Sequence, residues 1–403
     1  MKSRSEGILS INSGSSSIKF ALFQFIPTLD LLCTGSIVLL RGEAKLHYTD
    51  TVSKQEIQRS VKLSQFSEVA NYLLEFLRSK IEAVDLRAIG HRIVHGMQHT
   101  EPEKITPALI EELKQISTFA PEHLPAEISL IELFLKRYPD LLQVACFDTS
   151  FHTSMPAVAK LLPLPRKFSM KGIQRFGFHG ISCSYLMQEL EHEAGPMVAA
   201  GKIILAHLGN GASITAVKDG KSMDTSMGFT PAAGLVMGTR TGDIDPGIAA
   251  YLMKNEGFSI EQFDHLINHE SGLLGISDTT SDMGQLLLNE KSDNRAAEAI
   301  SLFCYQAIKW FGAFAAVLDG VDTIVFSGGI GENAPAIRER ICAGLTFLGL
   351  KIDAGCNDKN ATVISSPGSK VKAYVIPTNE ELMIASFVAK HIRTNIPNGH
   401  YGK

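Results

Sequence analysis

The distribution of hydrophobic and polar positions predicts strands and helices that alternate along the chain. In the first part, residues 7–50 resemble a run of short strands separated by glycine-containing turns, and residues 64–84 have apolar positions at helical spacing. The elements expected next are a strand at 89–94, helices at 106–118 and 125–138, and a strand at 142–147. This alternation is typical of an α/β fold.

The second half of the chain repeats this alternation. Strands are expected at 203–208, 212–217, 222–226, 321–326 and 371–376, and helices near 247–255, 260–268, 295–318 and 380–393. The dipeptide Asp219-Gly220 between two of these strands predicts a two-residue hairpin turn. Such hairpins add antiparallel strands to each sheet.

Two segments, 8–20 and 204–216, align without a gap and share four residues. Each consists of an apolar strand, a turn of glycine, serine or asparagine, and a second strand. Turns of this kind direct several backbone N–H groups to one point, which is the geometry that a polyphosphate requires. The duplication predicts a two-lobed kinase or ATPase.

Composition narrows the possible classes of protein. The chain has 403 residues, of which 45% are hydrophobic and 20% charged, as in globular proteins of about two domains. A net charge of −4 gives no electrostatic reason to bind nucleic acid or an anionic membrane. No run of 18 apolar residues and no secretory N-terminus is evident, and the six cysteines form no CxxC pair, so we expect a cytoplasmic protein.

Two charged residues lie in or after apolar strands. Arg92 needs an anionic partner if it is buried, and that partner is either an Asp or Glu side chain or a ligand carboxylate or phosphate. Asp148 follows the strand at 142–147, where it can bind magnesium, orient an arginine or cap the next turn.

Glycine-rich segments provide further candidates. Residues 12–19 lack the Walker A pattern, so this segment is either a phosphate-binding turn with Lys19 or a plain hairpin with a solvated lysine. Residues 327–333 follow a buried strand and precede an expected helix, for which Asn333 is the predicted N-cap. Arg240 lies in a polar loop rich in glycine and aspartate, and His179 lies between Phe178 and a glycine.

Together these segments resemble the acetate kinase family, whose two-lobed duplicated α/β fold is shared with sugar kinases, Hsp70 and actin and has an inter-lobe cleft. The resemblance rests on Asn12–Lys19, Gly90–Gly96, Phe147–His152, Arg175–Gly180, His207–Asp245, Gly328–Asn333 and Thr378–Leu382. It implies an N-terminal lobe at 1–150, a nucleotide-binding lobe at 151–380, and a terminal helix, about 381–403, that packs on the first lobe. It also implies a homodimer.

The resemblance further implies reversible transfer of a phosphoryl group from ATP to a short carboxylic acid, with Mg²⁺. Asn12 and Glu380 would hold the metal, with Glu381 as a competing ligand. Arg92 would bind the acid, lined by Val94, Phe178 and Pro231. The residues expected to act in catalysis are Asp148, His179, Arg240, Arg92 and Asn210. Those expected to bind the nucleotide are Ser15, Ser17, Lys19, His207, Leu208, Gly209, Asn210, Gly211, Asp282, Met283, Gly284, Gly329, Ile330, Gly331, Glu332 and Asn333.

Three positions depart from the family pattern. Glu122 stands where an apolar residue usually encloses the methyl group of the acid, so the substrate range is open. Asp282-Met283-Gly284 lacks the arginine that usually approaches the adenosine, and Cys183 replaces a histidine.

Two alternative functions remain open. A kinase of propionate or of another short acid differs by one methylene group, which is worth only about 1–3 kcal/mol. In an ATP-switched binding protein without catalysis, Arg92 and Arg240 would have no acid to bind.

Overall fold

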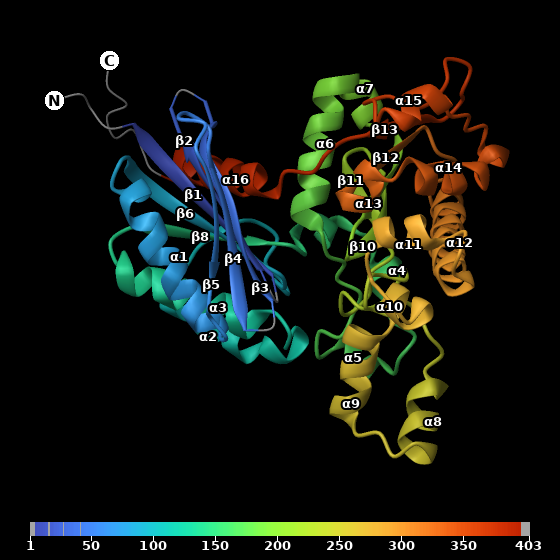
Figure 1. Cartoon of the computed structure of the whole chain (residues 1–403), viewed down its shortest axis with the longest axis horizontal. Helices are drawn as coiled ribbons and strands as arrows, with labels where there is room; N and C mark the ends of the chain where they lie inside the picture. The colour runs from blue at the N-terminus through green and yellow to red at the C-terminus, as the bar shows by residue number, and fades with distance from the viewer. Residues whose placement is uncertain (1–4, 15–16, 27, 41, 396–403) are drawn as a thin grey trace. The chain divides into compact units, whose positions relative to one another are not determined.

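The computed structural model of the protein describes residues 5–14, 17–26, 28–40 and 42–395. The chain divides into two compact units. Unit 1 contains Met1–Ser150 and Asn379–Lys403, and unit 2 contains Phe151–Thr378. Each unit is built on one mixed β-sheet with helices packed on it, as Figure 1 shows, so the predicted α/β fold class is confirmed.

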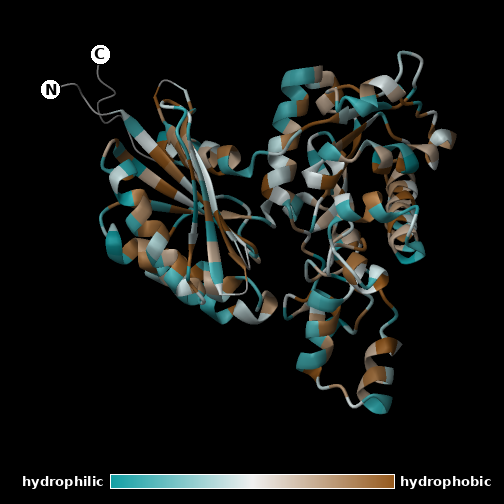
Figure 2. Ribbon diagram, in the orientation of Figure 1, coloured by the Kyte–Doolittle hydropathy of each residue, from teal (hydrophilic) through white to brown (hydrophobic). Residues whose placement is uncertain are grey.

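The sheet of unit 1 has the strand order β5-β4-β3-β2-β1-β6-β8-β7. Its strands are β1 (Glu6–Ser13), β2 (Ser17–Gln24), β3 (Asp30–Leu40), β4 (Glu43–Asp50), β5 (Glu56–Val61), β6 (Asp85–Ile93), β7 (Glu103–Lys104) and β8 (Leu142–Phe147). Strand β1 pairs antiparallel with β2 and parallel with β6, which in turn is parallel to β8. The central strands β1 and β8 are buried along nearly their whole length, and Figure 2 shows brown, hydrophobic positions among the strands of this sheet.

Among the described residues of unit 1, four α-helices accompany this sheet. They are α1 (Phe66–Ile81), α2 (Pro107–Gln115), α3 (Leu124–Arg137) and α16 (Glu380–Asn395). Helix α16 comes from the C-terminal end of the chain and packs on β1, β2 and β6. Its close approach to β6 requires a glycine, because a Cβ on Gly90 would lie 2.5 Å from Cγ2 of Ile384 and 2.7 Å from Cγ2 of Val388.

The sheet of unit 2 has the order β11-β10-β9-β12-β13. Its strands are β9 (Lys202–Leu208), β10 (Ala212–Lys218), β11 (Lys221–Thr225), β12 (Thr323–Ser327) and β13 (Lys372–Val375). The predicted turn between β10 and β11 is confirmed, with Asp219 at φ 51° and Gly220 at φ 70°. Positive φ at both central residues is the requirement of the type I′ hairpin.

The two sheets share one core pattern. In each, an antiparallel meander (β3-β2-β1 or β11-β10-β9) continues into two parallel strands (β6 and β8, or β12 and β13). The gap-free alignment of the two hairpins is wrong beyond the turn. Ile18 pairs with Ser13, whereas Ile214 pairs with Ala206, because the two strands are joined by turns of different length.

Unit 2 contains the remaining helices. They are α4 (Ala157–Lys160), α5 (Arg166–Ser169), α6 (Gly180–Ala194), α7 (Pro196–Ala199), α8 (Gly247–Asn255), α9 (Ile260–His265), α10 (Gly272–Ser277), α11 (Met283–Asn289), α12 (Asn294–Val317), α13 (Gly328–Asn333), α14 (Pro335–Ala343) and α15 (Ala354–Asp358). Helix α12 alone among the described helices is long and apolar enough to cross a membrane, by length and composition. It packs against α10, α11, α14 and β10, which is the environment of a core helix.

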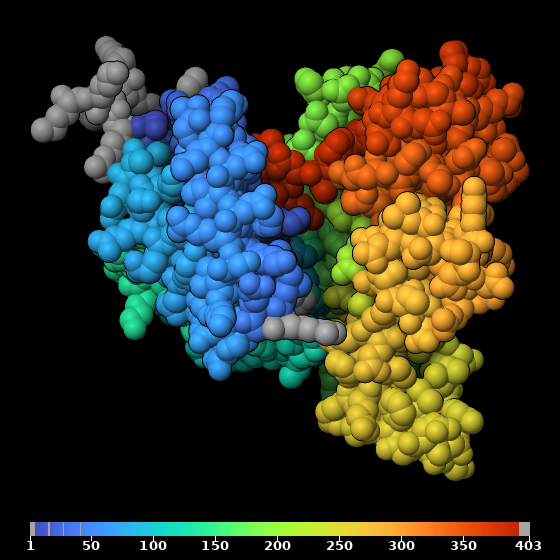
Figure 3. Space-filling model, viewed as in Figure 1, coloured from blue at the N-terminus to red at the C-terminus, as the bar shows by residue number. Residues whose placement is uncertain are grey.

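Exposed apolar side chains gather on α8 and α9 and the loop before them, which form one end of unit 2 in Figure 3 (yellow). They are Ile244, Ile248, Tyr251 and Ile260. The π-helical turn Leu266–Glu270 follows directly after α9, where the sequence predicted one helix over 260–268.

Candidate active site

In unit 1, the end of β1 meets the beginning of α16 at a group of polar side chains. Asn12 donates through Nδ2 to Oε2 of Glu380 at 2.8 Å and to Oε1 of Glu381 at 2.9 Å. Burial raises the pKa of Glu380, and the nearby Arg92 opposes this effect. The three residues predicted around a metal ion are therefore in mutual contact.

Arg92, on β6, is held by two acceptors beside this group. Its Nη1 donates to the backbone oxygen of Ser13 at 3.0 Å, and its Nη2 donates to Oδ2 of Asp148 at 2.9 Å. The side chain of Arg92 is 13% exposed and that of Asp148 is fully buried. Burial disfavours the charge of Arg92, but the surrounding carboxylates, Asp148 foremost, raise its pKa above the usual range. Asp148 therefore contacts an arginine, which is the arrangement expected for one of the three roles that the sequence left open.

Glu127 is a further carboxyl group in this region, and the sequence reasoning missed it. It lies on α3, is 2% exposed, and accepts a hydrogen bond from the backbone N–H of Val94 at 3.0 Å. Burial raises its pKa to about 7. A signal was available, because Glu127 falls three residues after Leu124 and four before Ile131, on the apolar stripe of the helix.

In unit 2, the turn Gly209–Gly211 joins β9 to β10 and is surrounded by predicted site residues. A Cβ on Gly211 would lie 3.3 Å from Nε2 of His179 and 3.9 Å from Nη1 of Arg240. A Cβ on Gly209 would lie 3.7 Å from the backbone nitrogen of Gly329. The turn therefore lies within contact distance of an imidazole, a guanidinium group and a backbone amide.

The loop that carries Arg240 is attached to this turn. The backbone N–H of Gly238 donates to the backbone oxygen of Asn210 at 2.9 Å. A side chain at Gly238 would collide with Oδ1 of Asn210. Glycine at this position allows the loop and the turn to pack together, which fixes Asn210 and Arg240 relative to one another.

His179 is placed by its own backbone and by a hydrogen-bonded chain. It precedes α6 at φ 59°, and its Nδ1 is 3.0 Å from Oγ of Ser213. Its ring centroid lies 4.3 Å from that of His207, whose Nδ1 is 2.9 Å from Oγ of Ser182. The same hydroxyl is 2.8 Å from Oγ1 of Thr378. With Nδ1 engaged, Nε2 of His179 is the nitrogen that faces Gly211.

The glycine-rich segment after β12 forms α13. The prediction that Asn333 is an N-cap is wrong: Ser327 is the N-cap and Asn333 is the last helical residue, because the backbone turns into the helix at the first glycine, Gly328, at φ 76°. Glu332 accepts from the backbone N–H groups of Gly328 at 2.8 Å and Thr378 at 3.1 Å.

Arg338 is a fully buried arginine that the sequence reasoning did not identify. It donates to the backbone oxygens of Gly331 at 2.8 Å, Glu332 at 3.0 Å and Asn357 at 2.7 Å, and to Asn side chains at 2.8 Å and 2.7 Å. It therefore fixes the end of α13 to α15.

The remaining nucleotide-binding candidates near the N-terminus belong to unit 1. Ser15 lies outside the described residues. Ser17 begins β2, and Lys19 lines a hollow of about 290 Å³ with Ser36, His47 and Glu381, all in unit 1. Lys19, Ser36 and His47 are direct neighbours across β2, β3 and β4.

Asp282 caps α11. Its Oδ1 accepts from the backbone N–H of Gln285 at 2.8 Å, and Met283 is buried. This is a structural use of the aspartate, in a segment that packs on α12.

The residues predicted to line the acid belong to both units. Val94 is in unit 1 and buried, and Phe178 (buried) and Pro231 (partly buried) are in unit 2. Glu122 is exposed. Cys183 is a core residue of α6, 3.8 Å from Oγ1 of Thr215.

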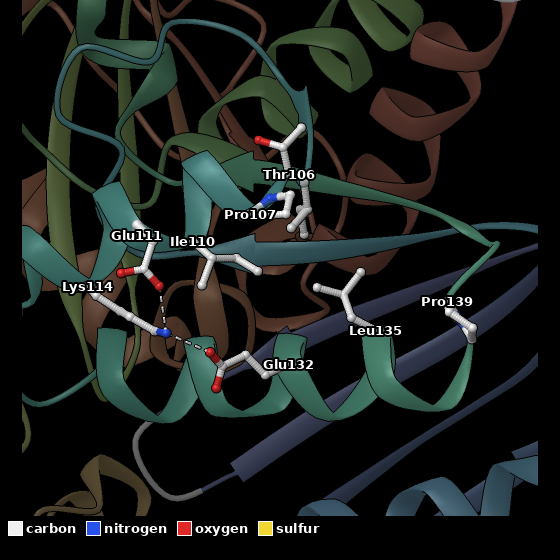
Figure 4. A pocket seen from close by; sticks show the side chains of 9 residues that line it. Thr106, Pro107, Ile110, Glu111, Lys114, Glu132, Leu135 and Pro139 are labelled. Carbon is white, nitrogen blue, oxygen red and sulfur yellow. Dashed lines mark hydrogen bonds and ion pairs between the residues drawn. The ribbon is translucent and has the colours of Figure 1, made fainter.

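A hollow of about 510 Å³ lies in unit 1 between α2 and α3 (Figure 4). Lys114 lies within it, 2.9 Å from both Glu111 and Glu132. None of the predicted site residues lines it.

Comparison with known proteins gives one family. The model of the acetokinase family matches residues 7–386. An acetate kinase of Rhodopseudomonas palustris (strain TIE-1) is 41% identical over 392 residues, which cover 95% of this chain and 98% of that protein. A propionate kinase of Citrobacter rodentium is 39% identical over 392 residues, covering 96% and 97%.

Solved structures agree. A propionate kinase from Francisella tularensis is similar with a TM-score of 0.88 and 38% identity, covering 95% of this chain and 98% of that one. An acetate kinase from Porphyromonas gingivalis is similar with a TM-score of 0.85 and 35% identity, covering 96% of this chain and 100% of that one.

Proposed function

Because the chain belongs to the acetokinase family, we propose that it is an ATP-dependent kinase that phosphorylates acetate reversibly. The γ-phosphoryl group of ATP moves to the carboxylate, giving acetyl phosphate and ADP. The observation that carries the proposal is the buried pair of Arg92 and Asp148. A guanidinium group fixed by two acceptors needs no reorganisation before it holds a second carboxylate.

The chemistry requires no general base. A carboxylic acid with a pKa near that of Asp or Glu, about 4, is already ionised at neutral pH. A carboxylate oxygen forms a bond to the γ-phosphorus while the bond between that phosphorus and the β,γ-bridging oxygen breaks. The electron pair of the broken bond leaves with ADP. We therefore assign Asp148 the role of orienting Arg92, and no proton transfer.

The main obstacle is repulsion between two anions. His179, Arg240 and Asn210 lie around the turn Gly209–Gly211, and we assign them to the equatorial oxygens of the transferring phosphoryl group. An arginine in such a position can be worth about 10³–10⁵ in rate. Arg92 and Val94 are assigned to the acid in unit 1, and Phe178 and Pro231 in unit 2.

The nucleotide is assigned to Lys19, Ser17, the turn that follows His207 and Leu208, and the helix α13 with Gly329, Ile330, Gly331 and Glu332. Mg²⁺ is assigned to the group formed by Asn12 and Glu380, because a carboxylate is a preferred ligand of this ion and Asn12, which donates to that carboxylate through Nδ2, also carries an amide oxygen that can bind the ion or one of its waters. When bound, the ion would supply positive charge that neutralises the phosphate oxygens. We assign Asp282, Met283 and Gly284 to contacts with the adenosine.

Propionate is the second candidate acid. Relatives of similar identity carry either name, acetate kinase or propionate kinase. Glu122 is exposed in unit 1, so it gives no ground for excluding either acid. The cysteines are free and five of the six are buried, which fits a reducing cytoplasm. A homodimer remains an expectation that light scattering can test.

The test is phosphorylation by the purified protein with Mg-ATP, trapping the acyl phosphate as its hydroxamate across formate, acetate, propionate and butyrate. We expect product from acetate or propionate, lost in Arg240→Ala and kept in Arg295→Ala, whose side chain is 55% exposed. ATP binding without hydroxamate from any acid would refute the proposal and favour a non-catalytic nucleotide-binding protein.

A further inference from the structure

Helix α3 buries a carboxyl group among apolar side chains. Its inner face consists of Leu124, Glu127, Ile128, Leu130, Ile131 and Phe134. Glu127 is the one ionisable residue on this face, and it is 2% exposed. A helix needs no carboxyl group for packing there, since Leu or Met of similar size would fill the space without a desolvation cost. The position therefore calls for a polar role.

The contacts of Glu127 connect it to Arg92. Oε2 accepts from the backbone N–H of Val94, which follows Arg92 by two residues and lies directly after the end of β6. Oε1 is buried and has no hydrogen-bond partner among the described residues. A carboxylate with a single donor is poorly stabilised, so ionisation of Glu127 depends on the charge of Arg92.

The charged neighbours of Glu127 come from two elements. Arg92 on β6 favours its ionised form, and Asp148 after β8 opposes it. Burial raises the pKa of the carboxyl to about 7 despite the arginine. His91 on β6 and His95 just after this strand are buried with a pKa of about 4, so both are neutral at this pH.

The remaining elements packed on α3 add no buried charge of their own. The buried face of α1 is entirely apolar. On the α2 side, Lys114 pairs with Glu132 in the exposed hollow of Figure 4. His123 is the N-cap residue of α3 itself and is partly buried.

We propose that Glu127 is a positioning residue whose protonation sets how much of the charge of Arg92 remains available to the carboxylate of the acid. The inference rests on the proposed function, because it assigns Arg92 to that carboxylate. When Glu127 is protonated, the carboxyl groups whose charges act on Arg92 are Asp148 and Glu380. When Glu127 is ionised, it adds a further buried carboxylate near Arg92, which offsets more of the arginine's charge and repels the incoming anion.

Binding of the acid is therefore pH-dependent, although the acid itself stays ionised. We expect the KM for acetate or propionate to rise by roughly threefold to tenfold between about pH 6 and pH 8, which bracket the pKa of about 7. The KM for ATP should not share this dependence on Glu127. The effect belongs to the acid, because only the acid is assigned to Arg92.

The experiment measures KM for the acid and for ATP, and kcat, over this pH range by the hydroxamate assay. In Glu127→Gln, whose amide still accepts from Val94, the KM for the acid should stay at its low-pH value throughout. The matched control is Glu132→Gln, the same change on the outer face of α3 with the side chain 47% exposed. The control should keep the pH dependence of the unmodified protein.

A KM for the acid that is flat with pH in the unmodified protein, or equally steep in Glu127→Gln, overturns the inference and leaves the kinase intact. If Glu127→Gln does not fold, Glu127→Met is the second neutral variant, with the same expectation. Absence of hydroxamate at every pH would instead remove the proposed function, and the inference with it.

Discussion

Replacing Asp148 by Asn tests the role of the buried pair in unit 1. Asn keeps a side-chain oxygen that can accept the hydrogen bond from Nη2 of Arg92, now at 2.9 Å from the carboxylate. It removes the negative charge, so the guanidinium group loses the fully buried counter-ion that holds it in place. Glu127 differs, because it is hydrogen-bonded to Val94 and not to Arg92, so its charge offsets that of Arg92 without orienting the side chain. Because Asp148 is fully buried and Arg92 is 13% exposed, water can compensate for little of this loss.

The size of the effect follows from the geometry. At 2.9 Å and an effective dielectric constant of about 20, the gross attraction is about 6 kcal/mol. Breaking a buried pair costs about 3–5 kcal/mol. Since Asn retains the hydrogen bond, the lower value, about 3 kcal/mol, applies. If this whole energy is lost from the stabilisation of the transition state, kcat/KM for the acid drops by about 150-fold.

The assay is hydroxamate formation at saturating Mg-ATP with varied acid. Asp278→Asn is the control, because Asp278 also contacts an arginine at 2.9 Å but with side chains 55% and 78% exposed. An exposed pair is worth about 0–1 kcal/mol, so this variant should remain within a few-fold of the unmodified protein.

The pH profile separates orientation from proton transfer. Asp148 helps to raise the pKa of Glu127, so in Asp148→Asn the ionisation of Glu127 should move to lower pH and remain visible. An ionisation near neutral pH that vanishes altogether in Asp148→Asn would identify Asp148 as a base. An activity loss as small as that of Asp278→Asn would also refute the reasoning.

Three further outcomes are expected. The pKa of Glu127 is about 7 in the folded protein against 4.5 in the unfolded chain, so its stabilising contribution is fully present below about pH 4.5. About 3 kcal/mol of the unfolding free energy is lost as the pH rises to about 7. Urea unfolding of Glu127→Gln should lack this loss, and equal pH dependence in both proteins would contradict the prediction. Gly328→Ala should raise the KM for ATP at least about tenfold, because a Cβ at φ 76° would lie 2.7 Å from the oxygen of Leu208; an unchanged KM for ATP refutes it. Arg338→Met should lower the unfolding free energy by about 3 kcal/mol, since the carbonyl of Gly331 and the other acceptors lose a buried donor; thermal denaturation within a degree of the unmodified protein would speak against it.

Much of the fold follows from local pattern. The strand at Leu142–Phe147 and the helix at Gly247–Asn255 agree with the predicted bounds, because each has an unambiguous period bounded by polar or turn residues. The prediction that Asn333 is an N-cap is wrong because the helix begins earlier, at Gly328. The low helix propensity of glycine gives no sign of a helix beginning there. The gap-free alignment of segments 8–20 and 204–216 does not hold beyond the turn, because a turn of different length shifts the strand pairing without changing the hydrophobic pattern of either strand.

Local pattern was enough to predict the α/β class, the order of elements, and which segments carry glycine turns and charged residues. The partners of those charges, by contrast, come from contacts between segments far apart in the chain. Arg92 and Asp148 are 56 residues apart, and Asn12 and Glu380 are 368 apart, so neither contact leaves a trace in local spacing. Glu127 has a pKa of about 7 because α3 and β6 enclose it. The free energy of a charge depends on its surroundings in three dimensions, and those are set by packing between elements distant in the chain.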